Sequence, residues 1–213
     1  MPDAMPHHLL GLYDSPFVRR VAITMTHYDV PFEHTSLSVF RHMDAMRPLN
    51  PLFKVPMLVL PSGEKLYESA YILDHLDEEA AARGQAPLTP PHGAARRDVL
   101  QGTALGMIAV EKAVALVYEF RRPDDKRWHE WEARLREQMR QALVLLEAQL
   151  NANGDWLVGQ TMTQADVTAA VTVGFIRYVV AEEWPVGLCP LLEGLGRRLE
   201  NTAAFRAVPI DEE

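Results

Sequence analysis

Cysteine is almost absent from the sequence, since Cys189 is the only one among 213 residues. A single cysteine excludes an internal disulfide and a Cys-x-x-Cys redox pair. The sequence also starts without a basic segment followed by an apolar one, so we expect no signal peptide. Both features are typical of proteins of the reducing cytoplasm, which is the location we expect.

Basic charge, long apolar runs and glycine loops are also scarce. Lysine and arginine number 21 against 29 aspartates and glutamates, giving a formal net charge of −8 that argues against a nucleic-acid partner. The longest apolar runs are too short to cross a bilayer, so no membrane partner is expected. No Walker-type or dinucleotide-binding glycine loop is present. The histidines show no ligand-like spacing, so no metal site is predicted.

Short β-favouring runs alternate with helical patterns over residues 1–83. Ser15 is placed as the N-cap of the first helix, with Pro16 at its first helical position. The basic pair Arg19-Arg20 within this helix is expected on a solvated face. The other predicted elements are strands at 9–13, 32–37, 57–60 and 65–67, and helices at 40–46 and 70–82. This order predicts a small α/β domain built on a four-stranded sheet.

Composition changes at residues 84–93, where three prolines and two glycines predict a linker. Residues 94–213 contain no convincing strand and are expected to form an all-helical domain. Gly102 and Gly106 lie four residues apart, which favours close packing between two helices. Thr163 and Asp166 have the spacing of a capping box, so Asp166 is expected to be structural.

The stretch Asn50–Pro56 and the pair Glu68-Ser69 carry the first functional signal. If the Val55–Pro56 bond is cis, the N–H and C=O of Val55 turn outward and can pair with an extended peptide. A helix that begins at Ser69 offers free N–H groups to a carboxylate, and the Glu68 carboxylate can bind an amine. Together these features suit a short γ-glutamyl peptide. The simpler alternative is a hairpin followed by a capped helix.

In their order and spacing, these motifs resemble the cytosolic glutathione S-transferase family, in particular bacterial members with a serine-type active site. The resemblance covers essentially the whole chain. It implies a thioredoxin-like N-terminal domain that binds glutathione, an all-α C-terminal domain that supplies the second-substrate pocket, and a homodimer. The motifs that carry it are Ser15-Pro16-Phe17, Asn50-Pro51, Val55-Pro56, Glu68-Ser69, Trp156–Gly159 and Thr163–Asp166.

The resemblance also implies which residues contact glutathione. The Val55 backbone would pair with the cysteinyl part, and Glu68 and Ser69 would hold the γ-glutamyl end. Arg41 or His42 would reach the glycine carboxylate. The glutathione-binding residues that we predict are His42, Lys54, Val55, Glu68 and Ser69. The second substrate is expected to be a small apolar electrophile, as in detoxification.

Ser15 is the predicted catalytic residue, because it can stabilise the glutathione thiolate. Lowering a thiol pKa from about 8.5 by about two units requires about 2.7 kcal/mol of preference for the thiolate. A hydroxyl that donates to an anion contributes roughly 1.5–3 kcal/mol, and a helix N-terminus adds roughly 0.3–1 kcal/mol. No general base is required. Tyr13 is an alternative hydroxyl donor, whereas a carboxylate of Asp14 facing the sulfur would oppose the effect.

Two alternatives remain on the same scaffold. A glutathione-dependent isomerase of the maleylacetoacetate type would offer basic residues to a dicarboxylate, for which Arg19, Arg122 and Arg177 are candidates. A non-catalytic member would bind glutathione, or a protein partner, without forming a thiolate. Asp14 beside Ser15 motivates this second alternative.

Overall fold

The computed structural model describes residues 6–210, and the chain divides into two compact units. The first comprises the residues up to Pro87 and those from Thr202 onward, and the second comprises Leu88–Asn201. The sequence placed the linker at 84–93 and assigned all of 94–213 to the helical domain. In the structure the chain instead returns to the first unit after Asn201.

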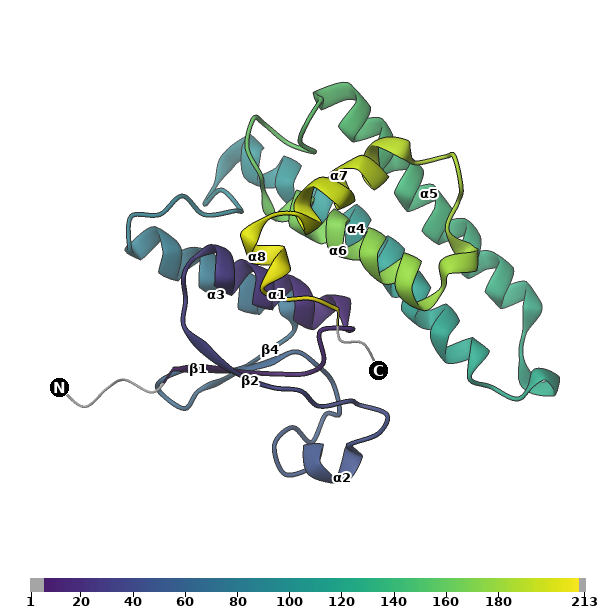
Figure 1. Cartoon of the computed structure of the whole chain (residues 1–213), viewed down its shortest axis with the longest axis horizontal. Helices are drawn as coiled ribbons and strands as arrows, with labels where there is room; N and C mark the ends of the chain where they lie inside the picture. The colour runs from purple at the N-terminus through teal and green to yellow at the C-terminus, as the bar shows by residue number, and fades with distance from the viewer. Residues whose placement is uncertain (1–5, 211–213) are drawn as a thin grey trace. The chain divides into compact units, whose positions relative to one another are not determined.

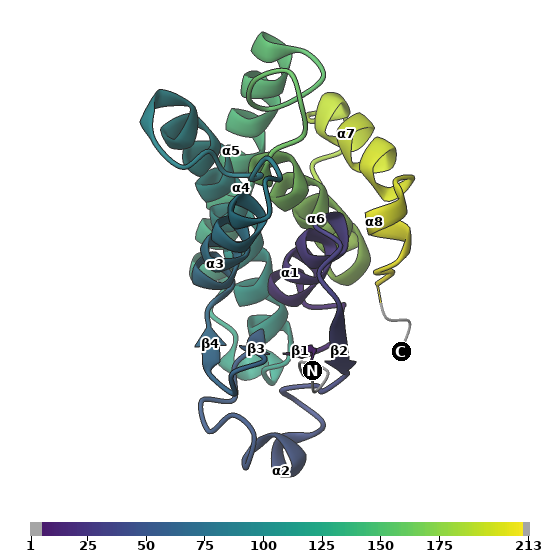
Figure 2. The ribbon, with the colours of Figure 1, turned by 90° about the vertical axis from the view of Figure 1, so that its left-hand side faces the viewer.

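The first unit contains a four-stranded sheet in the order β2-β1-β3-β4. Strand β1 pairs in parallel with β2, whereas the pairs β1–β3 and β3–β4 are antiparallel. Helices α1 and α3 lie on one side of this sheet and α2 on the other (Figures 1 and 2). The elements are β1 (His7–Leu10), α1 (Pro16–His27), β2 (Phe32–Thr35), α2 (Met43–Met46), β3 (Met57–Val59), β4 (Lys65–Tyr67), α3 (Ser69–Ala82) and α8 (Ala203–Arg206). The predicted thioredoxin-like α/β domain is confirmed.

Helix α1 is buried on almost every side, which corrects the prediction for Arg19-Arg20. These side chains are 2% and 1% exposed, not solvated. Arg19 Nε donates a hydrogen bond to the Val208 carbonyl oxygen (3.0 Å), and its guanidinium lies over the ring of Phe205. Because Phe205 and Val208 are themselves buried, the residues after Thr202 complete the core around α1. The contacts of the buried Arg19 with Phe205 and Val208 thus explain why the segment after Thr202 belongs to the first unit.

The second unit is all-helical, as predicted. Its helices are α4 (Gly93–Phe120), α5 (His129–Asn153), α6 (Gln164–Val179) and α7 (Pro190–Glu200), with short 3₁₀ turns at Asp124–Lys126 and Ala181–Glu183. Helix α6 packs against α4 and α7, and most of its side chains are buried. A Cβ atom at Gly102 would lie 3.0 Å from the Ala165 Cβ, and one at Gly106 would lie 3.0 Å from the Thr168 Cγ2. The predicted close packing at these glycines is therefore confirmed.

Helix α4 is long and apolar enough, by length and composition, to cross a membrane, with a mean hydropathy of 1.4 over its most apolar window. This finding differs from the expectation that the apolar runs are too short to cross a bilayer. The buried side chains of α4 recur at three- and four-residue intervals, from Val99 to Leu116, on the face that meets α5 and α6. One-sided burial of this kind is the pattern of a helix in a bundle core.

The start of α6 is closed by the Asp166 carboxylate, which is fully buried. Its Oδ2 accepts hydrogen bonds from the N–H and the hydroxyl of Thr163, and its Oδ1 accepts one from the Leu157 N–H, each at 2.8 Å. Burial raises the pKa of Asp166, and these hydrogen bonds oppose the shift. The capping box predicted at Thr163 and Asp166 is confirmed, and Asp166 has a structural role.

Candidate functional site

Ser15 occupies the predicted N-cap of α1, with Pro16 at the first helical position. Its backbone closes the loop before the helix. The Ser15 N–H donates to the Leu12 carbonyl (3.1 Å), and the Ser15 carbonyl accepts from the N–H groups of Val18 and Arg19. The Ser15 hydroxyl makes no capping hydrogen bond, and the first turn of α1 has no acidic residue. The hydroxyl and the helix N-terminus are thus both available to an anion.

Gly11 brings the start of α1 close to the loop before β3. It follows β1 with φ of 129°, a conformation that favours glycine. A Cβ atom there would lie 2.5 Å from the Val18 Cγ2 and 2.9 Å from the Val55 Cβ. Only a residue without a side chain therefore permits this approach between the α1 segment and Val55. Local sequence patterns did not predict this requirement.

The Val55–Pro56 peptide bond is cis, which was the condition for the predicted peptide-pairing role of Val55. Asn50, only 1% exposed, holds the preceding loop: its Nδ2 donates to the Lys54 carbonyl (2.6 Å) and its Oδ1 accepts from the Leu52 N–H (3.0 Å). Within residues 6–210, no hydrogen bond engages the backbone N–H or C=O of Val55. These two groups are therefore free to pair with an extended ligand.

Glu68 precedes α3 with φ of 65° and ψ of 122°. A non-glycine residue in this region costs roughly 1–3 kcal/mol, and such residues concentrate at functional sites. The Glu68 Oε1 lies 2.9 Å from Lys54 Nζ, with side chains 55% and 70% exposed. An exposed ion pair contributes at most about 1 kcal/mol. A ligand amine can thus replace Lys54 at the Glu68 carboxylate at little cost.

Ser69 begins α3 and is 1% exposed. Its Oγ accepts a hydrogen bond of 2.7 Å from the Arg20 guanidinium, which is itself 1% exposed. Burial lowers the pKa of Arg20 to about 10, and the nearby Glu68 charge opposes this shift. Arg20 therefore stays cationic at neutral pH. A fixed cation beneath a helix N-terminus strengthens the attraction of this position for a carboxylate.

Arg20 is the site residue that the sequence analysis missed. Its spacing of three residues from Phe17 and four from Thr24 places it on the same face of α1 as both, and Thr24 is buried. That spacing was a usable signal, because a buried arginine requires a polar partner.

Tyr13 packs against His34 with its ring stacked at 4.0 Å between centroids. His34 Nε2 donates a hydrogen bond to the Gly11 carbonyl (2.6 Å). The Tyr13 ring therefore helps to hold the loop that leads to Ser15.

The structure does not bring His42 to this group of residues. His42 is exposed at the start of α2, and its Nδ1 accepts a hydrogen bond of 3.1 Å from the Ser38 N–H. Helix α2 lies on the other side of the sheet from α1 and α3 (Figure 2). Across residues 6–210, no hydrogen bond or ion pair joins His42 to Ser15, Glu68 or Ser69. A contact between His42 and the glycine carboxylate stays a prediction.

The three arginines considered for a dicarboxylate substrate are all engaged within the protein. Arg19 is buried against Val208, as described above. Arg122 Nε lies 3.3 Å from a Glu119 carboxylate oxygen, and an Arg177 terminal nitrogen lies 3.3 Å from one of Glu193. Burial removes Arg19 as a candidate, whereas Arg122 and Arg177, with side chains 56% and 50% exposed, stay candidates for a dicarboxylate.

Cys189 is fully buried at the start of α7. Burial raises the pKa of its thiol to about 11, and the carboxylates of Glu147 and Glu193 add to the shift. A buried thiol with so high a pKa is not a nucleophile at neutral pH. The reactive sulfur of any thiol chemistry must therefore come from a ligand.

Residues 9–84 match the family model described as the glutathione S-transferase N-terminal domain. The uncharacterized GST-like protein YibF of Escherichia coli is 29% identical, in an alignment that covers 89% of this chain and 94% of YibF. Glutathione S-transferase U6 of Arabidopsis thaliana is 26% identical, covering 92% of this chain and 78% of the relative.

Two solved structures cover nearly the whole chain. A glutathione S-transferase of Methylobacterium radiotolerans, in complex with glutathione sulfonate, is 28% identical with a TM-score of 0.88 and covers 98% of this chain and 97% of that one. A glutathione transferase family member of Pseudomonas fluorescens, with bound glutathione, is 26% identical with a TM-score of 0.80. The match covers 97% of this chain and 100% of that one.

Proposed function

Because the chain belongs to the glutathione S-transferase family, we propose that it is a glutathione transferase acting on small apolar electrophiles. The observation that carries the proposal is the uncapped Ser15 hydroxyl at the N-terminus of α1. Two further features support the proposal: the backbone of Val55, and the start of α3 at Ser69, which attracts anions. Both belong to the same unit as Ser15.

Glutathione lies along this unit as an extended peptide in the proposed complex. Its cysteinyl backbone pairs with the free N–H and C=O of Val55. Its γ-glutamyl carboxylate binds at the start of α3, near Ser69 and the charge of Arg20. Its amine binds the Glu68 carboxylate in place of Lys54, whose own contact with glutathione stays a prediction. Arg41 and His42 stay the candidates for the glycine end.

Catalysis consists of stabilising the thiolate. The thiol proton leaves to solvent, and the sulfur anion accepts a hydrogen bond from the Ser15 hydroxyl beside the α1 N-terminus. The sulfur then forms a bond to the electrophilic carbon, and a leaving group departs with its electron pair. The hydroxyl and the helix end together supply roughly 2–4 kcal/mol, enough to lower the pKa of the thiol by about two units.

An ultraviolet difference titration of the protein with glutathione tests this assignment. Thiolate absorbance should appear with a pKa about two units below the value of free glutathione. In Ser15→Ala the pKa should return most of the way to the free value, while glutathione still binds. Ser62→Ala, which alters an exposed serine after β3, is the matched control and should leave the titration unchanged.

Two results contradict the proposal. An unshifted pKa in the bound complex would favour a non-catalytic glutathione-binding protein, with Asp14 opposing Ser15. Turnover that returns glutathione unchanged would identify an isomerase, because conjugation consumes the thiol.

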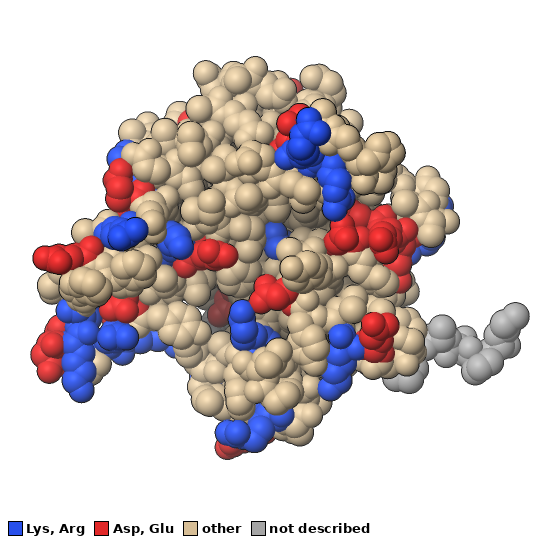
Figure 3. Space-filling view, turned by 180° about the vertical axis from the view of Figure 1, so that it is seen from behind, with Lys and Arg blue, Asp and Glu red and all other residues tan. Residues whose placement is uncertain are grey.

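We further propose a homodimer that works in the cytoplasm without nucleic-acid or membrane partners. Large apolar side chains are exposed on α3 and α4, among them Tyr71 (74%) and Leu100 (44%), and such side chains favour burial against a second copy. Figure 3 shows acidic and basic side chains interspersed, with no broad basic area on the face drawn. Sedimentation equilibrium distinguishes a dimer from a monomer, and Tyr71→Glu should shift the chain toward the monomer.

A further inference from the structure

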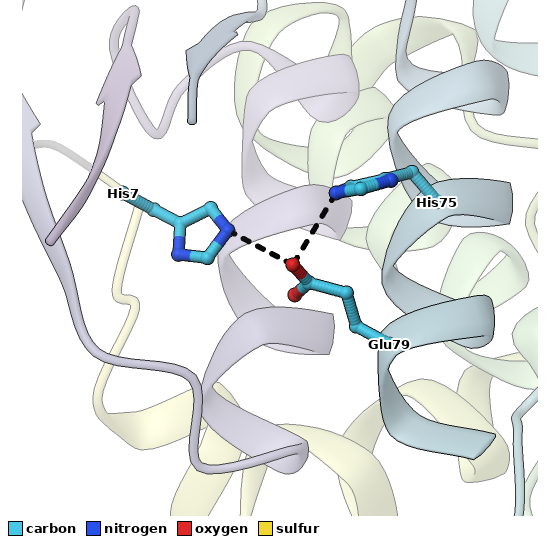
Figure 4. A group of neighbouring side chains, drawn as sticks. All are labelled: His7, His75 and Glu79. Carbon is cyan, nitrogen blue, oxygen red and sulfur yellow. Dashed lines mark ion pairs between the residues drawn. The ribbon is translucent and has the colours of Figure 1, made fainter. Parts of the chain in front are cut away.

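Three potential metal ligands meet between β1 and α3, away from the proposed glutathione-binding residues. His7 is the first residue of β1, and His75 and Glu79 lie one turn apart on α3. All three side chains point toward one another (Figure 4). Their ligand atoms lie within 4.8 Å of one another. Sequence spacing predicted no metal site, because His7 is far from the other two in the chain.

The distances between these atoms suit a tetrahedral ion. His7 Nε2 lies 3.5 Å from the Glu79 Oε1, and His75 Nε2 lies 3.4 Å from the same oxygen. With bonds of roughly 2.0–2.1 Å, neighbouring ligands of a tetrahedral zinc ion are about 3.3–3.5 Å apart. An ion can therefore be placed among the three atoms with little movement of the side chains.

The polar atoms at the centre of this group have unmet hydrogen-bonding capacity. His7 Nε2, His75 Nε2 and Glu79 Oε2 are each buried and make no hydrogen bond. His7 as a whole is only 7% exposed. Leaving three buried polar atoms without a hydrogen bond is costly, and a shared cation would satisfy them.

Arg83 also faces this cluster with its charge. Its NH1 lies 3.8 Å from the Glu79 Oε2, but its Nε and NH2 donate to Gln85 Oε1 and its NH2 also contacts the Tyr28 carbonyl. Arg83 thus donates mainly to other acceptors, and one oxygen of the Glu79 carboxylate is available to a second cation.

We propose that His7, His75 and Glu79 bind a divalent transition-metal ion of the zinc class. Two imidazoles and a carboxylate suit zinc, cobalt, nickel and copper, and a water molecule would complete the coordination. Along α3, Glu79 lies about 15 Å from Ser69 at a rise of 1.5 Å per residue. The ion would therefore fasten β1 to α3 and stabilise the first unit, without a part in the thiolate chemistry.

Zinc binding to the full chain, prepared without a histidine tag, tests the proposal. Isothermal titration with Zn²⁺ alone should give one equivalent per chain, and Co²⁺ in its place should give the intense visible absorption of a tetrahedral site. His75→Gln and Glu79→Gln should each weaken binding by more than the ~10–100-fold typical of losing an outer-shell partner. His8→Gln is the matched control, because the neighbouring His8 bonds to Thr35 Oγ1 and is outside the cluster.

A second readout keeps the test independent of the glutathione site. Zn²⁺ should raise the melting temperature of the wild type and of His8→Gln, but not that of Glu79→Gln. Variants are compared only when their far-ultraviolet circular dichroism matches the wild type, and Glu79→Gln decides the test if His75→Gln fails to fold. Absence of stoichiometric binding by the wild type, or equal binding by Glu79→Gln, would overturn the proposal.

Discussion

Helices α1 and α6 begin in opposite ways. At the start of α6, the buried Asp166 carboxylate accepts three hydrogen bonds and closes the helix within the protein. At the start of α1, Ser15 has the right identity and backbone for a cap, yet its hydroxyl makes no capping bond. A capping side chain usually contributes about 1 kcal/mol. The start of α1 therefore lacks the stabilisation that a capping side chain gives to the start of α6.

The N-cap side chains of α4 and α5 also make no capping bond, so it is the serine hydroxyl beside the free helix end that distinguishes the start of α1. A helix end whose donors are already satisfied has nothing left to bind an anion, whereas an uncapped one has. The unusual backbone of Glu68 before α3 fits the same pattern, because strain persists where function requires it. Substitutions at Ser15 and Asp166 can therefore separate a ligand-binding role from a structural one at these two helix starts.

The largest effect is expected for Ser15→Ala. Losing a hydroxyl that donates to the thiolate should cost roughly 1.5–3 kcal/mol of transition-state stabilisation, a fall in kcat of about 10–150-fold. Because Ser15 makes no capping bond, the free energy of unfolding should change by less than about 0.5 kcal/mol. Steady-state kinetics with an activated aryl halide, together with urea unfolding, measure both. A large loss of stability would mean that Ser15 is an ordinary cap.

Asp166→Asn should give the reverse result. The asparagine amide would face N–H groups that now donate to a carboxylate, so the free energy of unfolding should fall by about 1–3 kcal/mol. Activity per folded molecule should be unchanged. Thermal unfolding of Asp166→Asn and of the control Asp155→Asn, whose side chain is 89% exposed, tests this. Equal melting temperatures for the two variants would refute the assigned role.

Ser69→Ala tests the start of α3, where one side chain has both a proposed ligand-binding role and a structural role. The substitution removes a proposed ligand contact and the acceptor of the buried Arg20 guanidinium. We expect KM for glutathione to rise about tenfold with kcat nearly unchanged, because a contact made equally in the ground and transition states is lost. A fall in kcat without a change in KM would instead place Ser69 near the sulfur.

Local sequence signals were sufficient for much of the fold. The caps at Ser15 and Thr163 depend on residues a few positions apart, and both helix starts were predicted. The close packing at Gly102 and Gly106 followed from their spacing alone. Short strands were predicted with ends that differ from the structure: β1 was expected over 9–13 but spans His7–Leu10, and Gly11 follows it with a positive φ.

The errors arose where distant segments meet. Arg19-Arg20 was predicted to be solvated, since charged pairs usually are, but partners for these residues come from Ser69 and from the chain after Thr202. The short helix α8 was missed for the same reason. Nothing within a few residues of Arg20 reveals an acceptor on α3. Tertiary contacts therefore decided the parts of the site that local patterns could not.

The smallest effect is expected at the start of α5, where Glu132 is 1% exposed and pairs with Arg127. Hydrogen bonding to Arg127 lowers the pKa of Glu132 to about 2. Since the pKa is lowered on folding, this carboxylate stabilises the fold above its ordinary value of 4.5, and the contribution is lost as pH falls through about 2.

Glu132→Gln should therefore lower the free energy of unfolding by about 1 kcal/mol near neutral pH, because Arg127 and Arg136 can still reach water. The difference from the wild type should shrink steadily between pH 4.5 and 2. Urea unfolding across this range measures it, with the exposed Glu137→Gln as control. A difference independent of pH would show that the charge of Glu132, and hence its ion pair with Arg127, does not stabilise the fold.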